Sequence, residues 1–214
     1  MALSVVADNT RSAQDRDPVL RVALNGVSLH GRPILGPVSL TLARGETVAL
    51  TGPSGIGKTT LLRVIAGLER NQPGAVSRPD QIAMVFQEPT LLPWRTLRQN
   101  LTLMLGIGAE RAEAALAEVG LGGRGDDVPG QLSLGQQRRL ALARAFAAEP
   151  DLLLMDEPFV SLDAALADEM MALFERLRAR HPVATLIVTH DMGEARRLAD
   201  RVLRLEGNPA TLGA

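Results

Sequence analysis

A glycine-rich segment that ends in Lys58 and Thr59 contains the residues of this 214-residue sequence best suited to chemistry. It reads Gly52-Pro53-Ser54-Gly55-Ile56-Gly57-Lys58-Thr59, which fits the phosphate-loop pattern G-x-x-x-x-G-K-S/T at every fixed position. Glycines let the backbone form a concave nest whose N–H groups bind an anion. Lys58 supplies a charge for the β- and γ-phosphates, and the Thr59 hydroxyl is placed to ligate Mg²⁺. The segment predicts a nucleoside triphosphate site; a plain glycine-rich turn is the alternative.

The residues on either side predict the strand and the helix between which a phosphate loop lies. An apolar, β-branched run, Thr47–Thr51, precedes the segment, and a helix-like run, Thr60–Ala66, follows it. A helix that begins at the loop adds the positive end of its dipole to the anion site. This context favours a phosphate site over the plain turn.

Two carboxylates follow a second apolar strand. Leu152–Met155 is continuously apolar, and Asp156 and Glu157 come directly after it. Ligands gather at the carboxyl edge of open α/β sheets, which is where these acids would lie. Asp156 can hold Mg²⁺, usually through water, and Glu157 can orient and deprotonate an attacking water. The alternative is a strand that simply ends in solvated acids.

Four further residues are weak signals when each is taken alone. Ser133 can cap the following helix, whose first N–H groups would form a second anion site. Gln87 and His190 each follow a predicted strand, and Asp163 precedes a predicted helix. Their ordinary roles would be a surface glutamine, a solvated histidine at a strand end and a helix cap.

Continuous apolar runs predict a layered α/β fold with a mostly parallel sheet, since strands buried on both faces have this pattern. The strand-like segments are Val19–Leu24, Val38–Leu42, Thr47–Thr51, Ile82–Phe86, Leu152–Met155, Thr185–Thr189 and Val202–Leu205. No helix separates the first two, which predicts an antiparallel hairpin with its turn near Gly31-Arg32-Pro33. Helices are expected at Arg111–Val119, Gln136–Ala148 and Ala164–Arg180, the first of them in a mostly helical insertion.

Composition excludes several classes of site. The sequence has no Cys, so disulfides and thiolate metal sites are excluded, and its net charge of −1 gives no electrostatic footprint for nucleic acid. No run of about 18 apolar residues is present, so no membrane-spanning helix is expected. The stretch from Asp8 to Asp17 is polar and aperiodic, and a loose N-terminal arm is predicted over residues 1–18.

Together these motifs resemble those of ABC-type ATPases, in the same order and with similar spacing from Val19 to Leu205. The matching motifs are the phosphate loop (Walker A), Gln87 (Q-loop), Leu132–Gln136 (signature), Leu152–Glu157 (Walker B), Ser161–Asp163 (D-loop) and His190 (H-loop). The resemblance implies a P-loop NTPase core, an N-terminal antiparallel β-subdomain and a helical subdomain at about residues 88–148. All of these would form one ABC ATPase domain, residues 19–214.

The resemblance also implies a role for each matched residue. ATP would be bound by Gly52, Pro53, Ser54, Gly55, Ile56, Gly57, Lys58, Thr59 and Thr60, and Mg²⁺ by Thr59, Gln87 and Asp156. Glu157 would be the general base, and His190, Lys58 and Gln87 would assist catalysis. ATP held by a second subunit would be contacted in trans by Ser133, Gly135 and Gln136. Asp163 would couple the two sites across the dimer.

Two positions depart from the family pattern. His30 stands where an aromatic residue, often Tyr, stacks on adenine, and an imidazole stacks more weakly. Leu134 stands where the signature most often has Gly.

The run from Phe86 to Leu97 resembles importer ATPases of the nitrate, sulfonate and taurine group. Leu91, Leu92 and Trp94 would line an apolar cleft that receives a coupling helix of a permease; a buried core Trp is the alternative. The implied function is an ATP-hydrolysing subunit that energises solute transport, working as an ATP-sandwich homodimer or with a related subunit. It would lie at the cytoplasmic face of the membrane, bound to the permease, and the full system would include a solute-binding protein. A soluble regulatory or assembly ATPase without a permease is the other hypothesis.

Overall fold

A mostly parallel sheet forms the central layer of the molecule. The computed structural model describes residues 18–70 and 72–213, in which eight strands pair in the order β2-β3-β11-β10-β5-β9-β8-β7. Strands β10, β5, β9, β8 and β7 are parallel to one another. Their bounds are Thr47–Thr51 (β5), Ile82–Val85 (β7), Leu152–Asp156 (β8), Ala184–Val188 (β9) and Arg201–Gly207 (β10). Every residue of β5, β8 and β9 is buried, which confirms the prediction that these continuous runs are strands buried on both faces.

A smaller antiparallel sheet is formed mainly by the N-terminal part of the described chain. It has the order β4-β1-β6, with bounds Pro18–Leu24 (β1), Val38–Ala43 (β4) and Gly74–Ser77 (β6). Because β1 begins at Pro18, this residue does not belong to the predicted loose arm; residues 1–17 of that arm lie outside the described residues.

The predicted N-terminal hairpin is correct in its pairing and wrong in its connection. Strand β1 pairs with β4 in antiparallel fashion, but the chain between them forms a second hairpin, Val27–Leu29 (β2) and Arg32–Leu35 (β3). The turn at Gly31 belongs to this second hairpin. The physical reason is that Val27 and Leu35 are almost completely buried, which requires the connection to fold back onto the core.

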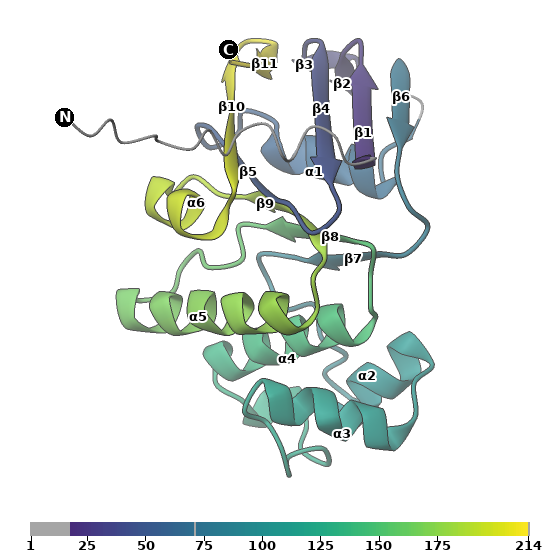
Figure 1. The fold of residues 1–214 in the computed structure, drawn as a ribbon, viewed down its shortest axis with the longest axis vertical. Helices are drawn as coiled ribbons and strands as arrows, with labels where there is room; N and C mark the ends of the chain where they lie inside the picture. The colour runs from purple at the N-terminus through teal and green to yellow at the C-terminus, as the bar shows by residue number, and fades with distance from the viewer. Residues whose placement is uncertain (1–17, 71, 214) are drawn as a thin grey trace, which may run out of the picture.

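The helices cover the central sheet and form one end of the molecule. Figure 1 shows α2 and α3 at the opposite end from the three-stranded sheet. The remaining elements are Lys58–Ala66 (α1), Leu97–Leu105 (α2), Ala109–Glu118 (α3), the 3₁₀ turn Pro129–Gln131, Leu134–Ala147 (α4), Ala164–Arg180 (α5), Met192–Leu198 (α6) and Ala210–Leu212 (β11). Helices α2, α3 and α4 pack on one another, while the boundary of a helical subdomain at about 88–148 stays a prediction. Among the described residues, no helix has the length and apolarity to cross a membrane.

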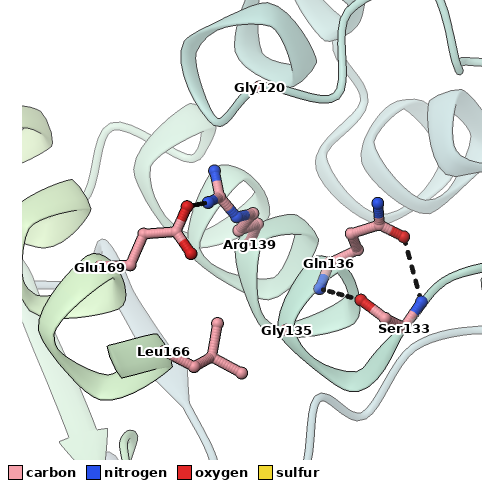
Figure 2. A pocket seen from close by; sticks show the side chains of 7 residues that line it. All are labelled: Gly120, Ser133, Gly135, Gln136, Arg139, Leu166 and Glu169. Carbon is pink, nitrogen blue, oxygen red and sulfur yellow. Dashed lines mark hydrogen bonds and ion pairs between the residues drawn. The ribbon is translucent and has the colours of Figure 1, made fainter. Parts of the chain in front are cut away.

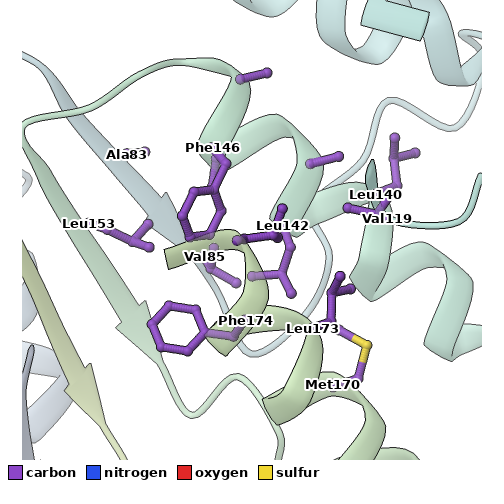
Figure 3. Close-up of a cluster of buried hydrophobic side chains, with 14 of the residues drawn as sticks. Ala83, Val85, Val119, Leu140, Leu142, Phe146, Leu153, Met170, Leu173 and Phe174 are labelled. Carbon is purple, nitrogen blue, oxygen red and sulfur yellow. The ribbon is translucent and has the colours of Figure 1, made fainter. Parts of the chain in front are cut away.

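Two hydrophobic clusters fix β8 from its opposite faces. Leu153 and Met155 pack into the cluster built by α4 and α5, which includes Phe146 and Phe174 (Figure 3). Leu152 and Leu154 point the other way, into the cluster that contains the α1 side chains. This alternation holds the strand rigidly and thereby sets the position of the two acids at its carboxyl end.

Candidate active site

The phosphate loop connects β5 to α1 through three glycines in the left-handed region. Gly52, Gly55 and Gly57 have φ angles of 146°, 76° and 111°. A Cβ atom on Gly52 would lie 2.7 Å from the carbonyl oxygen of Leu205, a backbone atom that cannot swing away. Glycine is therefore required at this position, both for the φ angle and for the close approach of β10.

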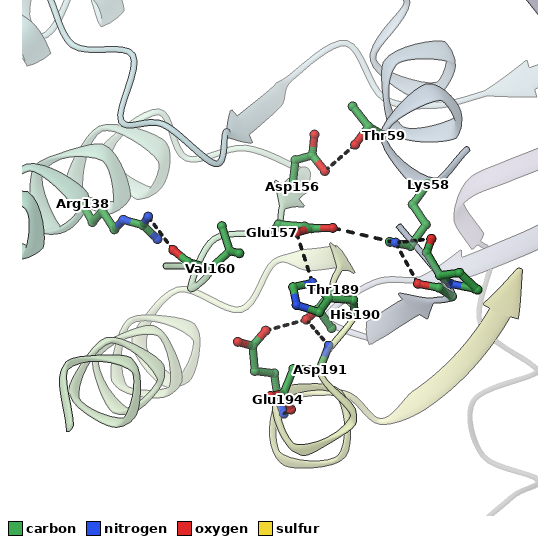
Figure 4. Close-up of polar contacts among 12 residues, drawn as sticks. Lys58, Thr59, Arg138, Asp156, Glu157, Val160, Thr189, His190, Asp191 and Glu194 are labelled. Atoms are coloured by element: carbon green, nitrogen blue, oxygen red, sulfur yellow. Dashed lines mark hydrogen bonds and ion pairs between the residues drawn. The ribbon is translucent and has the colours of Figure 1, made fainter. Parts of the chain in front are cut away.

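Lys58 is buried inside the curve of this loop. Its side chain is 4% exposed, and its Nζ donates to the carbonyl oxygens of Gly52 at 2.8 Å and Pro53 at 3.0 Å. The same ammonium lies 3.7 Å from Oε1 of Glu157. The loop thus holds a positive charge at its concave side, facing the acid that follows β8 (Figure 4).

Thr59 and Asp156 form an oxygen-rich pair beside the loop. The Thr59 hydroxyl donates to Oδ1 of Asp156 at 3.0 Å. Burial raises the pKa of Asp156, and the Thr59 hydrogen bond only partly offsets this effect. Hydroxyl and carboxylate oxygens are ligands that Mg²⁺ prefers, and a divalent cation would favour the charged carboxylate. The pair therefore fits Mg²⁺, and Gln87 lies exposed just beyond β7, the strand next to β8.

Glu157 and His190 are brought together from two neighbouring strands. Oε2 of Glu157 lies 3.2 Å from Nδ1 of His190, and the Glu157 amide donates to the carbonyl of Val188 at 2.9 Å. Glu157 has a φ of 45°, a conformation that costs a non-glycine residue about 1–3 kcal/mol and that clusters at functional sites. The predicted base and its predicted partner are thus in contact.

Three residues that the sequence analysis missed hold the His190 turn. Oγ1 of Thr189 donates to Oε2 of Glu194 at 2.6 Å and accepts from the amide of Asp191 at 3.0 Å. The Asp191 carboxylate in turn caps α6. The available signal was the helix-capping Asp directly after His190, which predicts an ordered turn there.

The signature residues lie on a different surface from this cluster. The Ser133 hydroxyl accepts from the Gln136 amide at 3.3 Å, and Oε1 of Gln136 accepts from the Ser133 amide at 3.1 Å, which completes a capping box for α4. A pocket of about 340 Å³ opens here (Figure 2), lined by Gly120, Ser133, Gly135, Gln136, Arg139, Leu166 and Glu169. None of the phosphate-loop residues lines it. Asp163 caps the nearby helix α5 through the amide of Leu166.

His30 lies in the turn between β2 and β3, with its side chain exposed and a φ of 50°. If the imidazole stacks on adenine, His30→Tyr should tighten ATP binding by about two- to tenfold and His30→Ala should weaken it, because aromatic stacking contributes about 0.5–1.5 kcal/mol. Titration with a fluorescent ATP analogue measures both changes. His181→Tyr, at another exposed histidine, should leave the affinity unchanged; equal affinities in both His30 variants would contradict the stacking role.

Trp94 is exposed on the loop before α2, so the buried core tryptophan is the wrong alternative. Its exposed fraction is 72%, whereas Leu91 and Leu92 are half-buried beside it. The fully buried Asn100 holds this loop: Oδ1 accepts from the Leu92 amide at 2.8 Å, and Nδ2 donates to the Leu92 carbonyl at 3.1 Å. Nδ2 also donates to the carbonyl oxygens of Arg95 at 3.2 Å and Thr96 at 3.0 Å.

Comparison with known proteins decides the family. Residues 35–160 match the family described as ABC transporter. The chain belongs to the ABC transporter family. It is 53% identical over 177 residues to the aliphatic sulfonates import ATP-binding protein SsuB 1 of Pseudomonas fluorescens, covering 82% of this chain and 68% of that protein. It is 48% identical over 188 residues to SsuB 3 of Paraburkholderia xenovorans, covering 86% and 76%.

A solved structure of an ABC protein has the same fold. The dimeric post-hydrolysis state of the ATP-binding cassette MJ0796, bound to ADP and Pi, superimposes with a TM-score of 0.77 at 28% identity, covering 91% of this chain and 97% of that one. The predictions of an ABC-type ATPase, of its α/β fold and of an ATP-hydrolysing transport subunit are therefore confirmed. These comparisons do not favour the soluble alternative, and the roles of single residues and the binding of Mg²⁺ stay predictions.

Proposed function

We propose that this ABC ATPase energises the import of organic sulfonates through a partner permease and acts as a dimer with ATP between its subunits. The division of the nucleotide machinery into two separate surfaces carries the proposal. Lys58, Glu157 and His190 form one cluster, while Ser133 and Gln136 lie at a pocket that this cluster does not share. A second subunit in head-to-tail orientation would bring the two surfaces to the same ATP.

Each residue of the cluster has one task in this proposal. Lys58 and the loop amides bind the triphosphate, and Glu157 accepts a proton from the attacking water while His190 holds its carboxylate. Ser133, Gly135 and Gln136 of the second subunit bind the γ-phosphate from the opposite side. Mg²⁺ held by Thr59, Asp156 and Gln87 would offset the phosphate charge as the bond to the γ-phosphoryl group breaks.

The permease would dock on the loop that carries Trp94. An exposed aromatic side chain beside half-buried leucines, on a loop fixed by Asn100, is a pre-formed apolar surface. This contact would place the ATPase at the cytoplasmic face of the membrane. The second subunit is either another copy of this chain or a related ATPase, and a solute-binding protein would deliver the sulfonate. The SsuB relatives are named as import proteins for aliphatic sulfonates, which supports this class of solute.

Reconstitution tests the proposed function directly. The ATPase would be co-expressed with a candidate permease and a candidate solute-binding protein from the same organism and placed in proteoliposomes. We expect ATP-dependent uptake of an alkanesulfonate, together with ATP hydrolysis that rises when the loaded binding protein is added. ATP hydrolysis that is independent of the permease, in a stable complex without a membrane protein, would support the soluble alternative.

Trp94→Ala should uncouple the ATPase from the permease. Truncation of an aromatic hot spot costs about 2–4 kcal/mol of binding, so we expect at least a tenfold loss of permease binding and of uptake. ATP hydrolysis by the isolated subunit should stay unchanged, because Trp94 does not line the Ser133 pocket and makes none of the polar contacts of Lys58 and Glu157. Leu68→Ala removes another exposed apolar side chain, 57% exposed, and serves as the control. Unaltered uptake in the Trp94 variant would exclude this docking site.

A further inference from the structure

We propose that Arg138 is a positioning residue that couples the two nucleotide surfaces within one subunit. Its guanidinium joins the signature helix α4 to the segment that follows the predicted base, Glu157. ATP of the second subunit, bound at the start of α4, would in this way set the geometry of Glu157 at this subunit's own ATP. The inference rests on the proposed function, since it requires the dimer with two bound ATP molecules.

The contacts of Arg138 carry the proposal. Arg138 is two residues beyond Gln136 on α4 and is 7% exposed. Nη1 donates to the carbonyl oxygen of Pro158 at 2.5 Å. Nη2 donates to that of Val160 at 2.7 Å, the bond drawn in Figure 4. Pro158 is bonded directly to Glu157. A single rigid fork thus holds two carbonyls of one short segment.

These two hydrogen bonds restrain the segment from Glu157 to Asp163. It includes two residues in the left-handed region, Glu157 at φ 45° and Ser161 at φ 61°. The hydrogen bonds within the segment are long, with 3.3 Å from the Val160 amide to the Glu157 carbonyl and 3.4 Å from the Leu162 amide to the Phe159 carbonyl. Charge-assisted hydrogen bonds from a guanidinium are shorter and about twice as strong as neutral ones. Among the described residues, Arg138 therefore donates the strongest hydrogen bonds that this backbone accepts.

Arg138 is buried without an acidic partner among the described residues. Its guanidinium contacts backbone carbonyls and forms no ion pair with a carboxylate of the described residues. The buried Nε has no hydrogen-bond partner in the described chain. Burial also lowers the pKa of Arg138. The guanidinium also borders a cavity of about 10 Å³, enough for a single water, together with Phe86 and Pro89 on either side of Gln87. The segments after β7 and β8 thus both lie beside α4 at Arg138.

This arrangement predicts a specific consequence for catalysis. A ligand that binds to Ser133 and Gln136 changes the position of the first turn of α4, and Arg138 transmits that change to Pro158. The Glu157 carboxylate then aligns only when the second subunit's ATP is in place. Hydrolysis would depend cooperatively on ATP, with a Hill coefficient approaching the number of sites, about two.

Arg138→Met and Arg138→Lys test the proposal in the full-length ATPase. Met removes both donors at similar volume, and Lys keeps the charge but not the rigid fork. We expect kcat to fall about tenfold or more and the Hill coefficient to fall from about two toward one in the Met variant, with an intermediate effect in the Lys variant. The Kd of the monomer for a fluorescent ATP analogue should change by less than about twofold, since Arg138 does not border the phosphate loop.

Arg111→Met is the matched control, because Arg111 donates to the Ala147 carbonyl at the other end of α4 at 3.0 Å. It should leave the Hill coefficient unchanged. A wild-type Hill coefficient and kcat in the Arg138 variants would overturn the proposal. A variant that loses activity only because it is thermally unstable, and that keeps a Hill coefficient of about two, would also overturn it. If the Met variant does not fold, the Lys variant decides by the same measures. A wild-type protein that neither hydrolyses ATP nor dimerises with it would instead contradict the proposed function.

Discussion

Glu157→Gln is expected to abolish steady-state ATP hydrolysis while ATP binding persists. Loss of a general base lowers turnover by about 10²–10⁴-fold, and an amide cannot accept the proton of the attacking water. The amide retains the shape of the carboxylate, and its oxygen can still accept a hydrogen bond from His190 or Lys58. The triphosphate site is therefore preserved, and the closed ATP-bound dimer should accumulate because its exit by hydrolysis is blocked.

Phosphate release and size-exclusion chromatography with MgATP measure these two effects. The matched control is Glu46→Gln, at a carboxylate 11% exposed that binds the Ala43 amide and Arg201 outside the site. It should hydrolyse ATP at the wild-type rate and show no trapped dimer. Hydrolysis at the wild-type rate by the Glu157 variant would show that another group acts as the base.

Lys58→Ala is expected to weaken ATP binding by about 100-fold or more. A hydrogen bond to a charged group contributes about 1.5–3 kcal/mol, and Lys58 is placed to bind two phosphates. Its removal also leaves the Gly52 and Pro53 carbonyls without their present donor. Lys58→Arg should recover little affinity, since a planar guanidinium does not fit the space of an ammonium inside the loop. Calorimetric titration with ATP measures the loss.

The composition offers an independent check, because Lys58 is the only lysine among the 214 residues. Acylation with an amine-reactive ester, followed by peptide mass spectrometry, therefore reports on this one side chain and the N-terminal amine. Lys58 is buried and hydrogen-bonded without ATP, so its acylation should be slow; ATP should slow it further and leave the rate at the N-terminal amine, the internal control, unchanged. Unprotected Lys58 at saturating ATP, or full ATP affinity in the alanine variant, would contradict the phosphate-loop assignment.

Local features of this protein were predicted well from the sequence. The glycines, Lys58 and Thr59 lie next to one another in the chain, and Ser133 and Gln136 form a capping box within one helical turn. The buried strands were also clear, since both faces of β5, β8 and β9 are apolar. Such features depend on interactions between near neighbours or on burial alone, and periodicity and spacing encode both.

Contacts between distant segments were decided only by the tertiary structure. The pairing of Glu157 with His190 was expected solely from the family resemblance, and it arises here because β8 and β9 are adjacent and in register. The exposure of Trp94 was likewise expected only from a family resemblance, and the hydrogen bonds from Arg138 to the segment after Glu157 carried no sequence signal. The type of a residue does not by itself show whether its side chain lies in the core, on the surface or between two segments. Its place follows from how the sheets and helices pack, which is a property of the whole fold.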